Sequence, residues 1–176
     1  MGWPGERSNV VRSALLTDRM EFFRRRCAEC GLANTHQRQV IYRALAESEE
    51  HLSPEALYEK VKAEIPAISL GTIYRNIRIF QNFGLLKEVT PLHDSLRLDP
   101  NLANHNHLVC RCCHWIFDLE EEDVAPLQVR KALPRKFQIE RFDILGVCSW
   151  CAEKAKAGRI VTTHAKQHEG EEAWDK

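Results

Sequence analysis

The sequence has 176 residues, of which 44% are hydrophobic and 28% charged, with 25 basic and 25 acidic side chains. That length accommodates one ordinary domain or two small ones, and the composition is typical of a globular protein rather than a disordered or fibrous one. The zero net charge gives no overall attraction to nucleic acid and argues against a simple polycationic binding mode, so any DNA affinity has to come from a local patch. No apolar run reaches the ~18 residues that a membrane span needs, and the first residues lack the apolar region of a secretion signal. We therefore expect a cytoplasmic protein with no membrane partner.

Four helices are predicted in the first half of the chain, because apolar residues recur there at helical spacing between boundary signals. They are expected over about 20–30, 37–48, 54–62 and 70–83. Gly31 is placed to end the first helix and Thr35 to cap the second. Ser53-Pro54-Glu55 opens the third with a capping hydroxyl, a proline at the first helical position and an acid near the positive end of the dipole. Residues 1–17 lack periodicity and are expected to form a flexible N-terminal extension.

After Gly84 the pattern changes to two short extended runs, 85–90 and 95–98, joined by a turn that contains Pro91, His93 and Asp94. Helices followed by a hairpin are the element order of a winged helix-turn-helix. We therefore assign residues 18–99 to a winged-helix DNA-binding domain. The segment 100–104 is short, polar and turn-forming, and we interpret it as a hinge.

A second lobe, 105–158, follows the hinge. Strands are expected at 107–110, 115–119 and 137–147, with a crossover helix at 120–133. A lobe of this size cannot cover both faces of its sheet, so we expect it to bind metal and to dimerise. Residues 159–176, rich in Lys, Glu and His, are expected to form a flexible tail. The predicted fold class is α+β, with an N-terminal winged helix-turn-helix domain and a small C-terminal α/β dimerisation domain.

Two Cys-x2-Cys pairs lie in the second lobe, Cys110 with Cys113 and Cys148 with Cys151. Two thiolates three residues apart in a turn can share one Zn2+, and a second pair completes the tetrahedron that zinc prefers. The long interval between the pairs implies that the metal would join the two ends of the lobe, so that binding energy becomes folding energy. Buried or redox-active cysteines are the alternative interpretation. Cys112 could replace Cys113, although two intervening residues suit the turn better.

Cys27 and Cys30 form another Cys-x2-Cys pair, but they lie in a predicted helix and have no second pair of their own, so we expect them to serve packing. A thioredoxin-like role would need a strand before the motif. A redox switch built on Cys27, Cys30 and Cys112 is an alternative function. A zinc hydrolase would need an open metal position and a general base, and the chain has no His-Glu-x2-His motif. We therefore do not expect an enzyme.

Histidine and aspartate side chains form a second candidate metal site. His105 and His107 alternate along a predicted strand, which directs both imidazoles to the same side. Asp99, Asp118 and the more distant His51 complete the set. Mixed nitrogen and oxygen ligands suit Fe(II), Mn(II), Ni(II) or Zn(II). The alternative is that these histidines are ordinary surface residues.

The helix at 70–83 is expected to be the DNA-contacting element. Its outward face is predicted to carry basic and polar side chains, namely Thr72, Tyr74, Arg75, Asn76 and Arg78. Between Ser69 and Lys87 the chain has three basic residues and no acid, a local positive face on an otherwise neutral protein. A solvated helix face is the alternative, so the prediction depends on the order of elements more than on charge.

Several motifs resemble, in the same order, those of the ferric uptake regulator family. They are His51-x2-Pro54, Ile68-Ser69-Leu70-Gly71-Thr72-Ile73-Tyr74-Arg75-Asn76, Phe83-Gly84-Leu85, His105-Asn106-His107-Leu108-Val109-Cys110 and Gly146-Val147-Cys148. The resemblance runs from about Arg19 to Lys156. It implies a winged helix joined by a hinge to a dimerisation domain. It also implies a homodimer that binds a double-stranded DNA operator, and usually represses, when its regulatory site holds metal.

The resemblance further implies roles for individual residues. Tyr74 and Arg75 would reach into the major groove, with Arg38 near the phosphates and Thr72 on the same helix face. The implied ligands of a structural Zn2+ are Cys110, Cys113, Cys148 and Cys151. The implied ligands of a regulatory Fe2+ or Mn2+ are His51, Asp99, His105, His107 and Asp118. Because the regulatory set draws on both lobes, bound metal would fix their relative angle and favour the DNA-binding conformation.

Aspartates at 99 and 118, where iron regulators often carry glutamate, resemble the peroxide-responsive branch of the family. That branch implies that bound Fe(II) reacts with hydrogen peroxide and that His51 and His105 become oxidised. An iron- or zinc-responsive repressor without peroxide sensing is the alternative. Three groups of residues depart from the family pattern. Asn104, Asn106 and Glu140 replace additional metal ligands, Ala33 and Asn34 replace a basic minor-groove contact, and His114 replaces a glycine after Cys113.

Overall fold

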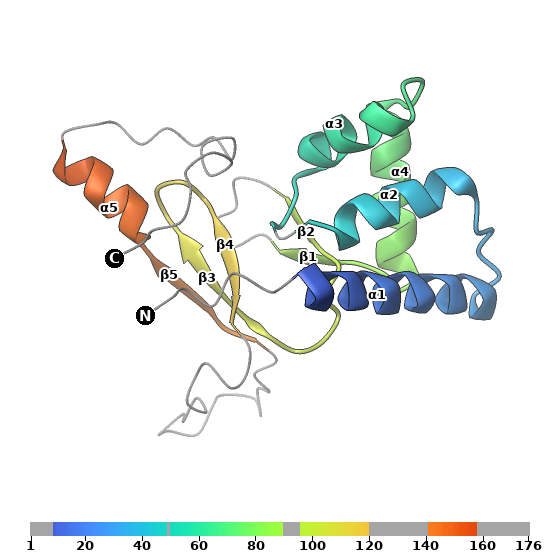
Figure 1. The fold of residues 1–176 in the computed structure, drawn as a ribbon, viewed down its shortest axis with the longest axis horizontal. Helices are drawn as coiled ribbons and strands as arrows, with labels where there is room; N and C mark the ends of the chain where they lie inside the picture. The colour runs from blue at the N-terminus through green and yellow to red at the C-terminus, as the bar shows by residue number, and fades with distance from the viewer. Residues whose placement is uncertain (1–8, 49, 90–95, 120–140, 158–176) are drawn as a thin grey trace, which may run out of the picture. The chain divides into compact units, whose positions relative to one another are not determined.

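In the computed structural model, four helices and a small hairpin precede a three-stranded sheet and a last helix (Figure 1). The structure describes residues 9–48, 50–89, 96–119 and 141–157. The chain divides into two units, here called the N-terminal unit, Met1–Leu102, and the C-terminal unit, Ala103–Lys176. The division falls within the segment 100–104 that the sequence marks as turn-forming.

The helices of the N-terminal unit begin where the sequence provides capping hydroxyls. Their bounds are α1 Asn9–Glu29, α2 His36–Ala46, α3 Pro54–Glu64 and α4 Leu70–Asn82. Thr35, Ser53 and Ser69 cap the last three, each accepting a hydrogen bond from the backbone N–H three residues later at 3.1–3.3 Å. Each cap satisfies an N–H that has no partner within the helix. The predicted helix starts at Thr35 and Ser53 are therefore confirmed.

The first helix is longer than predicted. α1 begins at Asn9, so residues 9–17, which were expected to belong to a flexible extension, are helical. No glycine or proline lies between Asn9 and Gly31, so nothing in the sequence stops the helix from extending towards the N-terminus, and Leu16 packs against the core. At the other end Gly31 adopts a φ of 65°, and Leu32 N–H donates to the Cys27 carbonyl at 2.9 Å. This glycine ends the helix as predicted.

Three aromatic side chains form the centre of the N-terminal core. Phe23 on α1 stacks on Tyr42 on α2 with ring centroids 4.5 Å apart. Phe80 on α4 meets both rings edge-on, at 5.7 Å and 5.8 Å. All three are fully buried, together with aliphatic residues from α2, α3 and α4. The core therefore joins α4 firmly to α1 and α2.

The hairpin after α4 consists of β1 Lys87–Val89 and β2 Arg97–Asp99, which pair antiparallel. Leu98 also forms an antiparallel bridge with Leu52, the residue before the α3 cap, and its N–H donates to the Leu52 carbonyl at 2.9 Å. In an antiparallel register the next pair along is His51 opposite Asp99. The predicted turn at Pro91, His93 and Asp94 lies outside the described residues.

The C-terminal unit contains a three-stranded sheet of order β4-β3-β5. Its strands are β3 Asn106–Cys110, β4 Ile116–Leu119 and β5 Asp143–Gly146, with β4 antiparallel and β5 parallel to the central β3. Helix α5, Ser149–Lys156, follows directly on β5 and was not predicted (Figure 1). The predicted crossover helix at 120–133, the start of the last strand at 137–140 and the tail at 159–176 lie outside the described residues.

The α+β class is confirmed, with a helical winged N-terminal domain and a C-terminal sheet domain. Among the described residues, none of the helices has the length and apolar character that crossing a bilayer requires.

Candidate metal centres and DNA-contact face

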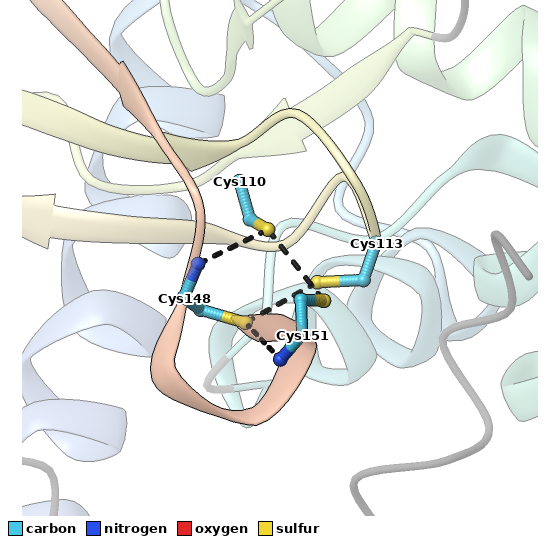
Figure 2. A group of neighbouring side chains, drawn as sticks. All are labelled: Cys110, Cys113, Cys148 and Cys151. Atoms are coloured by element: carbon cyan, nitrogen blue, oxygen red, sulfur yellow. Dashed lines mark hydrogen bonds between the residues drawn. The ribbon is translucent and has the colours of Figure 1, made fainter. Parts of the chain in front are cut away.

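Four cysteine side chains of the C-terminal unit point toward one another (Figure 2). Cys110 and Cys113 lie at the turn after β3, and Cys148 and Cys151 lie at the start of α5. The Sγ atoms of Cys110 and Cys151 are 3.8 Å apart, and those of Cys113 and Cys148 are 3.9 Å apart. Four sulfurs at the usual ~2.3 Å from a tetrahedral zinc are about 3.8 Å from one another. The donor set and its spacing therefore fit Zn2+.

Backbone N–H groups are directed at these sulfurs. Cys148 N–H donates to Cys110 Sγ at 3.4 Å, and Cys151 N–H donates to Cys148 Sγ at 3.5 Å. Burial disfavours the Cys110 thiolate, but the N–H groups of Cys148, Cys113 and Cys112 outweigh it and lower the pKa of that thiol to about 6. Burial raises the pKa values of Cys113 and Cys151. A bound cation would favour ionisation of the Cys113 and Cys151 thiols against this burial, as it does in a structural zinc site.

The remaining cysteines do not join this cluster. Cys112 is half-buried and packs beside it, and it is not among the four grouped sulfurs. Cys27 lies in the N-terminal core, where burial raises the pKa of its thiol, and Cys30 is half-buried near the end of α1. A buried thiol with a raised pKa is a poor redox sensor. The packing role expected for Cys27 agrees with this environment.

His114 follows Cys113 with a φ of 61°, the left-handed region that glycine adopts without strain. This conformation lets His114 N–H donate to the Cys110 carbonyl at 2.8 Å, which closes the turn that carries the first cysteine pair. His114 therefore adopts the backbone conformation that a glycine would adopt at this turn, at the cost of backbone strain.

Replacing His114 with glycine is expected to stabilise the zinc-loaded protein by about 1 kcal/mol, because glycine removes the left-handed strain. The midpoint of denaturant unfolding, followed at the C-terminal unit, measures this gain. His114→Ala is the matched control, since it keeps a Cβ and should bring no such gain. If the glycine variant is no more stable than the alanine variant, backbone strain at His114 does not destabilise the protein.

Residues of the second predicted metal site lie close together within each unit. In the N-terminal unit the Leu52–Leu98 bridge places His51 beside Asp99, with Nε2 and Oδ1 3.9 Å apart. Both side chains are nearly enclosed, at 6% and 2% exposure. A neutral imidazole and a carboxylate at this separation can serve as two ligands of one divalent cation.

In the C-terminal unit, His105, His107 and Asp118 converge. Asp118 on β4 lies directly opposite His107 on β3, and its Oδ1 is 3.7 Å from His107 Nε2 and 3.5 Å from His105 Nε2. Donor atoms about 2.1 Å from a metal stand about 3.0 Å apart at the right angle of an octahedron and about 3.4 Å apart at a tetrahedral angle. The two distances from Asp118 Oδ1 are slightly longer than the wider of these spacings, and the set of two nitrogens and one oxygen suits Fe2+ or Mn2+.

The Nδ1 atoms of the two histidines face the other way. His105 Nδ1 lies 3.0 Å from the Ala103 carbonyl, and His107 Nδ1 lies 3.0 Å from Asp143 Oδ1 on β5. Both oxygens can only accept, so each Nδ1 carries the proton and each Nε2 is left with its lone pair for a metal. The sequence interpretation did not include Asp143. Only the parallel register of β3 and β5, which pairs His107 with Asp143, reveals it.

Asn106, one of the three residues that stand in place of additional metal ligands, links two parts of the sheet. Asn106 Oδ1 accepts a hydrogen bond from Phe142 N–H at 3.2 Å and so links β3 to the segment before β5. Asn104 is exposed, and Glu140 lies outside the described residues. These contacts give no support to a third metal site.

The candidate DNA-contact face lies on α4. Tyr74, Arg75 and Arg78 are exposed, and Thr72 is half-buried with its hydroxyl 2.9 Å from that of its cap, Ser69. The prediction that Asn76 lies on this outward face is wrong, because Asn76 is only 5% exposed. Its amide donates to the Thr72 carbonyl at 2.9 Å, and its Oδ1 accepts from Arg38 Nε at 3.3 Å. A buried amide needs such partners, and helical periodicity alone does not reveal them.

Three hydrogen bonds hold two of the side chains proposed for DNA contact, Arg38 and Tyr74. Arg38 on α2 is held by Asn76 and by the Ala33 carbonyl, to which its guanidinium donates at 2.6 Å. The Tyr74 hydroxyl donates to Glu55 Oε1 at 2.6 Å, and this hydrogen bond lowers the pKa of the Glu55 carboxyl. Ordering these side chains in advance reduces the entropy cost of a later contact.

Comparison with known proteins places these features in a family. The model of the ferric uptake regulator family matches residues 29–145. The peroxide-responsive repressor PerR of Staphylococcus aureus is 34% identical over 128 residues, which cover 72% of this chain and 86% of that protein.

Solved structures share the fold. The Helicobacter pylori ferric uptake regulator matches with a TM-score of 0.58 at 19% identity, over 78% of this chain and 93% of that one. A zinc uptake regulator complexed with zinc and DNA matches with a TM-score of 0.56 at 17% identity, over 80% of this chain and 97% of that one. The family match and the sequence identity together identify the protein: this chain belongs to the ferric uptake regulator family of metal-responsive transcriptional repressors, and it is not an enzyme.

Proposed function

We propose that this protein is a homodimeric repressor that binds a double-stranded DNA operator when a regulatory site holds Fe2+ or Mn2+, and that it senses hydrogen peroxide. The convergence of His105, His107 and Asp118 in the C-terminal unit carries this proposal, because it provides three prepared ligands for a divalent metal. A structural Zn2+ held by the four grouped cysteines completes the metal content.

The regulatory ligands are proposed to be His51 and Asp99 from one unit with His105, His107 and Asp118 from the other. His105, His107 and Asp118 alone would leave positions of a five-coordinate or octahedral ion open, and His51 and Asp99 supply further ligands of the kind these metals accept. An ion that takes ligands from both units would stabilise one arrangement of the two, and its loss would release them. This would be a two-state switch. The metal would shift the equilibrium between the two arrangements by the difference in its affinity for them.

DNA contact is proposed for α4, with Tyr74 and Arg75 reaching base edges and Thr72 and Arg38 on the same face. Arg75 is exposed and basic, and α4 is anchored to the core by Phe80 behind it. Arg38, which two hydrogen bonds already orient, is suited to a phosphate contact. Phosphate contacts position a recognition helix, whereas contacts to base edges give sequence specificity.

Peroxide sensing is supported by the aspartates at positions 99 and 118 and by the relative from Staphylococcus aureus, which is a peroxide-responsive repressor. In the overall reaction hydrogen peroxide would give one oxygen atom to a ligand histidine and leave as water. Bound Fe2+ would supply the electron that breaks the O–O bond, and the Fe3+ so formed would take back the electron that the oxygenated ring loses with its proton. His51 and His105 are the proposed targets. An oxidised imidazole loses its ligand geometry, so the metal and the DNA would both be released.

The test exposes Fe2+-loaded protein to a small dose of hydrogen peroxide and examines its tryptic peptides by mass spectrometry, with Mn2+-loaded protein as the control. DNA binding is measured in parallel with a duplex that the Mn2+-loaded protein selects from a random library. The expected result is a gain of one oxygen on His51 or His105 in the iron sample only, with loss of DNA binding. His36, which is exposed at the start of α2, is the internal control and should stay unmodified.

Unmodified histidines together with retained, metal-dependent DNA binding would reject peroxide sensing. That outcome would favour an iron- or zinc-responsive repressor that uses the same residues. Loss of the response on replacing Cys27, Cys30 and Cys112, with the histidines intact and unmodified, would favour a thiol switch instead.

A further inference from the structure

His107 occupies a distinctive position among the proposed ligands of the C-terminal unit. It is fully buried on β3, the central strand, and has an aspartate directly opposite it on each neighbouring strand. Asp118 on β4 faces its Nε2, whereas Asp143 on β5 faces its Nδ1. One imidazole is therefore held between two carboxylates that contact different nitrogens.

The geometry points to Asp143 as a positioning residue for the regulatory metal, acting through His107. We propose that its carboxylate accepts the Nδ1 proton of His107, fixes the tautomer and ring orientation, and directs Nε2 toward the ion beside Asp118. This inference rests on the regulatory site proposed above and adds a residue to its support. Asp143 is not proposed as a ligand, because it lies on the Nδ1 side of the ring, away from the Nε2 lone pair.

The partner of His107 differs from that of His105 in charge. His105 Nδ1 meets a neutral carbonyl, that of Ala103, whereas His107 Nδ1 meets a carboxylate at the same distance of 3.0 Å. A carboxylate draws the Nδ1 proton more strongly and so makes the other nitrogen a better electron donor to a metal. We therefore expect His107 to be the stronger of the two imidazole ligands.

Asp143 is itself held in place by a cation. Arg141 Nε lies 3.2 Å from Asp143 Oδ1, and one of its terminal nitrogens lies 3.5 Å from Oδ2, so the guanidinium spans both carboxylate oxygens. The planar guanidinium restricts rotation of the carboxylate and balances its charge. The result is a chain of contacts from Arg141 through Asp143 to His107 Nδ1.

Holding the sheet together is the obvious other role for Asp143. The backbone ladder between β3 and β5 already pairs four residues of each strand, and Asn106 adds a side-chain link to Phe142 N–H. The contact from Asp143 to His107 is therefore not the connection on which strand pairing depends. The two roles predict different outcomes for metal affinity and for zinc content.

The test measures Mn2+ affinity of the full-length, zinc-loaded protein by competition with a chromophoric chelator, for the wild type, Asp143→Asn and Asp143→Ala. Removing the partner of a metal-bound histidine typically weakens affinity by roughly 10- to 100-fold. We expect a loss in that range for both variants, with a changed Co2+ absorption spectrum and unchanged zinc content.

Asp143→Glu, which keeps the carboxylate, should recover part of the affinity. Glu153→Gln, an exposed change of equal charge on α5, is the matched control and should bind as the wild type does.

Mn2+ affinity of Asp143→Asn and Asp143→Ala within twofold of the wild type would overturn the positioning role. Loss of zinc along with Mn2+ would also overturn it, because it would assign Asp143 to folding of the sheet. His107→Ala separates this inference from the function on which it rests. If His107→Ala binds Mn2+ as tightly as the wild type, the regulatory site itself is wrong. If only His107→Ala loses Mn2+, the site stands and the role of Asp143 fails.

Discussion

Cys151→Ala is expected to unfold the C-terminal unit and leave the N-terminal unit folded. Among the described residues of the C-terminal unit, the buried apolar side chains other than cysteines are Val109 and Ile116. The remaining buried cluster consists of the cysteines themselves, packed with Trp115 and Trp150. A structural zinc contributes about 10–16 kcal/mol of apparent binding energy, which equals or exceeds the total stability of a typical domain. We therefore expect loss of one ligand to remove most of the stability of this unit.

The measurement combines zinc content with limited proteolysis. Cleavage of the variant should concentrate in 103–157, while the helices of the N-terminal unit stay resistant. Cys112→Ala is the matched control, because its thiol lies beside the cluster but is not among the four grouped sulfurs. It should keep one zinc per chain and wild-type resistance. Chelation of zinc from the wild type under reducing conditions should reproduce the pattern, and added Zn2+ should reverse it.

A variant that lacks Cys151 yet retains zinc and resists proteolysis would contradict the four-cysteine site. Zinc retention and proteolytic resistance in a Cys113→Ala variant, with loss of both in Cys112→Ala, would assign Cys112 as the ligand in place of Cys113. That arrangement was left open by the sequence, which places Cys112 and Cys113 side by side.

Features of this protein that depend on residues close together in the chain could be predicted from its sequence. The helix caps at Thr35 and Ser53 each need one hydroxyl three residues before the N–H that it accepts. The two cysteine pairs likewise predict a metal site from their local spacing alone. The resemblance to the family then supplied the distant partners, such as His51, that spacing could not connect.

Features that depend on strand register or burial could not be predicted. Asp143 becomes a partner of His107 only because β5 runs parallel to β3 in a register that sets the two opposite each other, 36 residues apart in the chain. Asn76 lies on the polar side of α4 by periodicity, but Arg38 from α2 covers it. The early start of α1 was missed because Asn9 and the residues after it carry no strong boundary signal.

Phe80→Ala is expected to lower the free energy of unfolding of the N-terminal unit by about 3–5 kcal/mol. The ring is fully buried and meets Phe23 and Tyr42 edge-on, so its removal leaves a cavity and ends two aromatic contacts. Denaturant unfolding followed by circular dichroism, which is dominated by the four helices, measures the change. Phe22→Ala is the matched control. That ring is half-buried at the edge of the core, and its loss should cost less than half as much.

The same substitution tests whether the buried side of α4 keeps the proposed DNA-contact face in position. Ile73, Ile77 and Phe80 are the buried apolar residues of α4, while Tyr74 and Arg75 lie on its exposed side. Weakening the inner side should therefore reduce DNA binding even though none of the residues proposed to contact DNA has changed. Zinc content should stay at the wild-type value, because the cysteines belong to the other unit. A loss of less than about 1 kcal/mol would show that the core closes over the missing ring. In that case α4 depends on its aliphatic contacts rather than on the aromatic cluster.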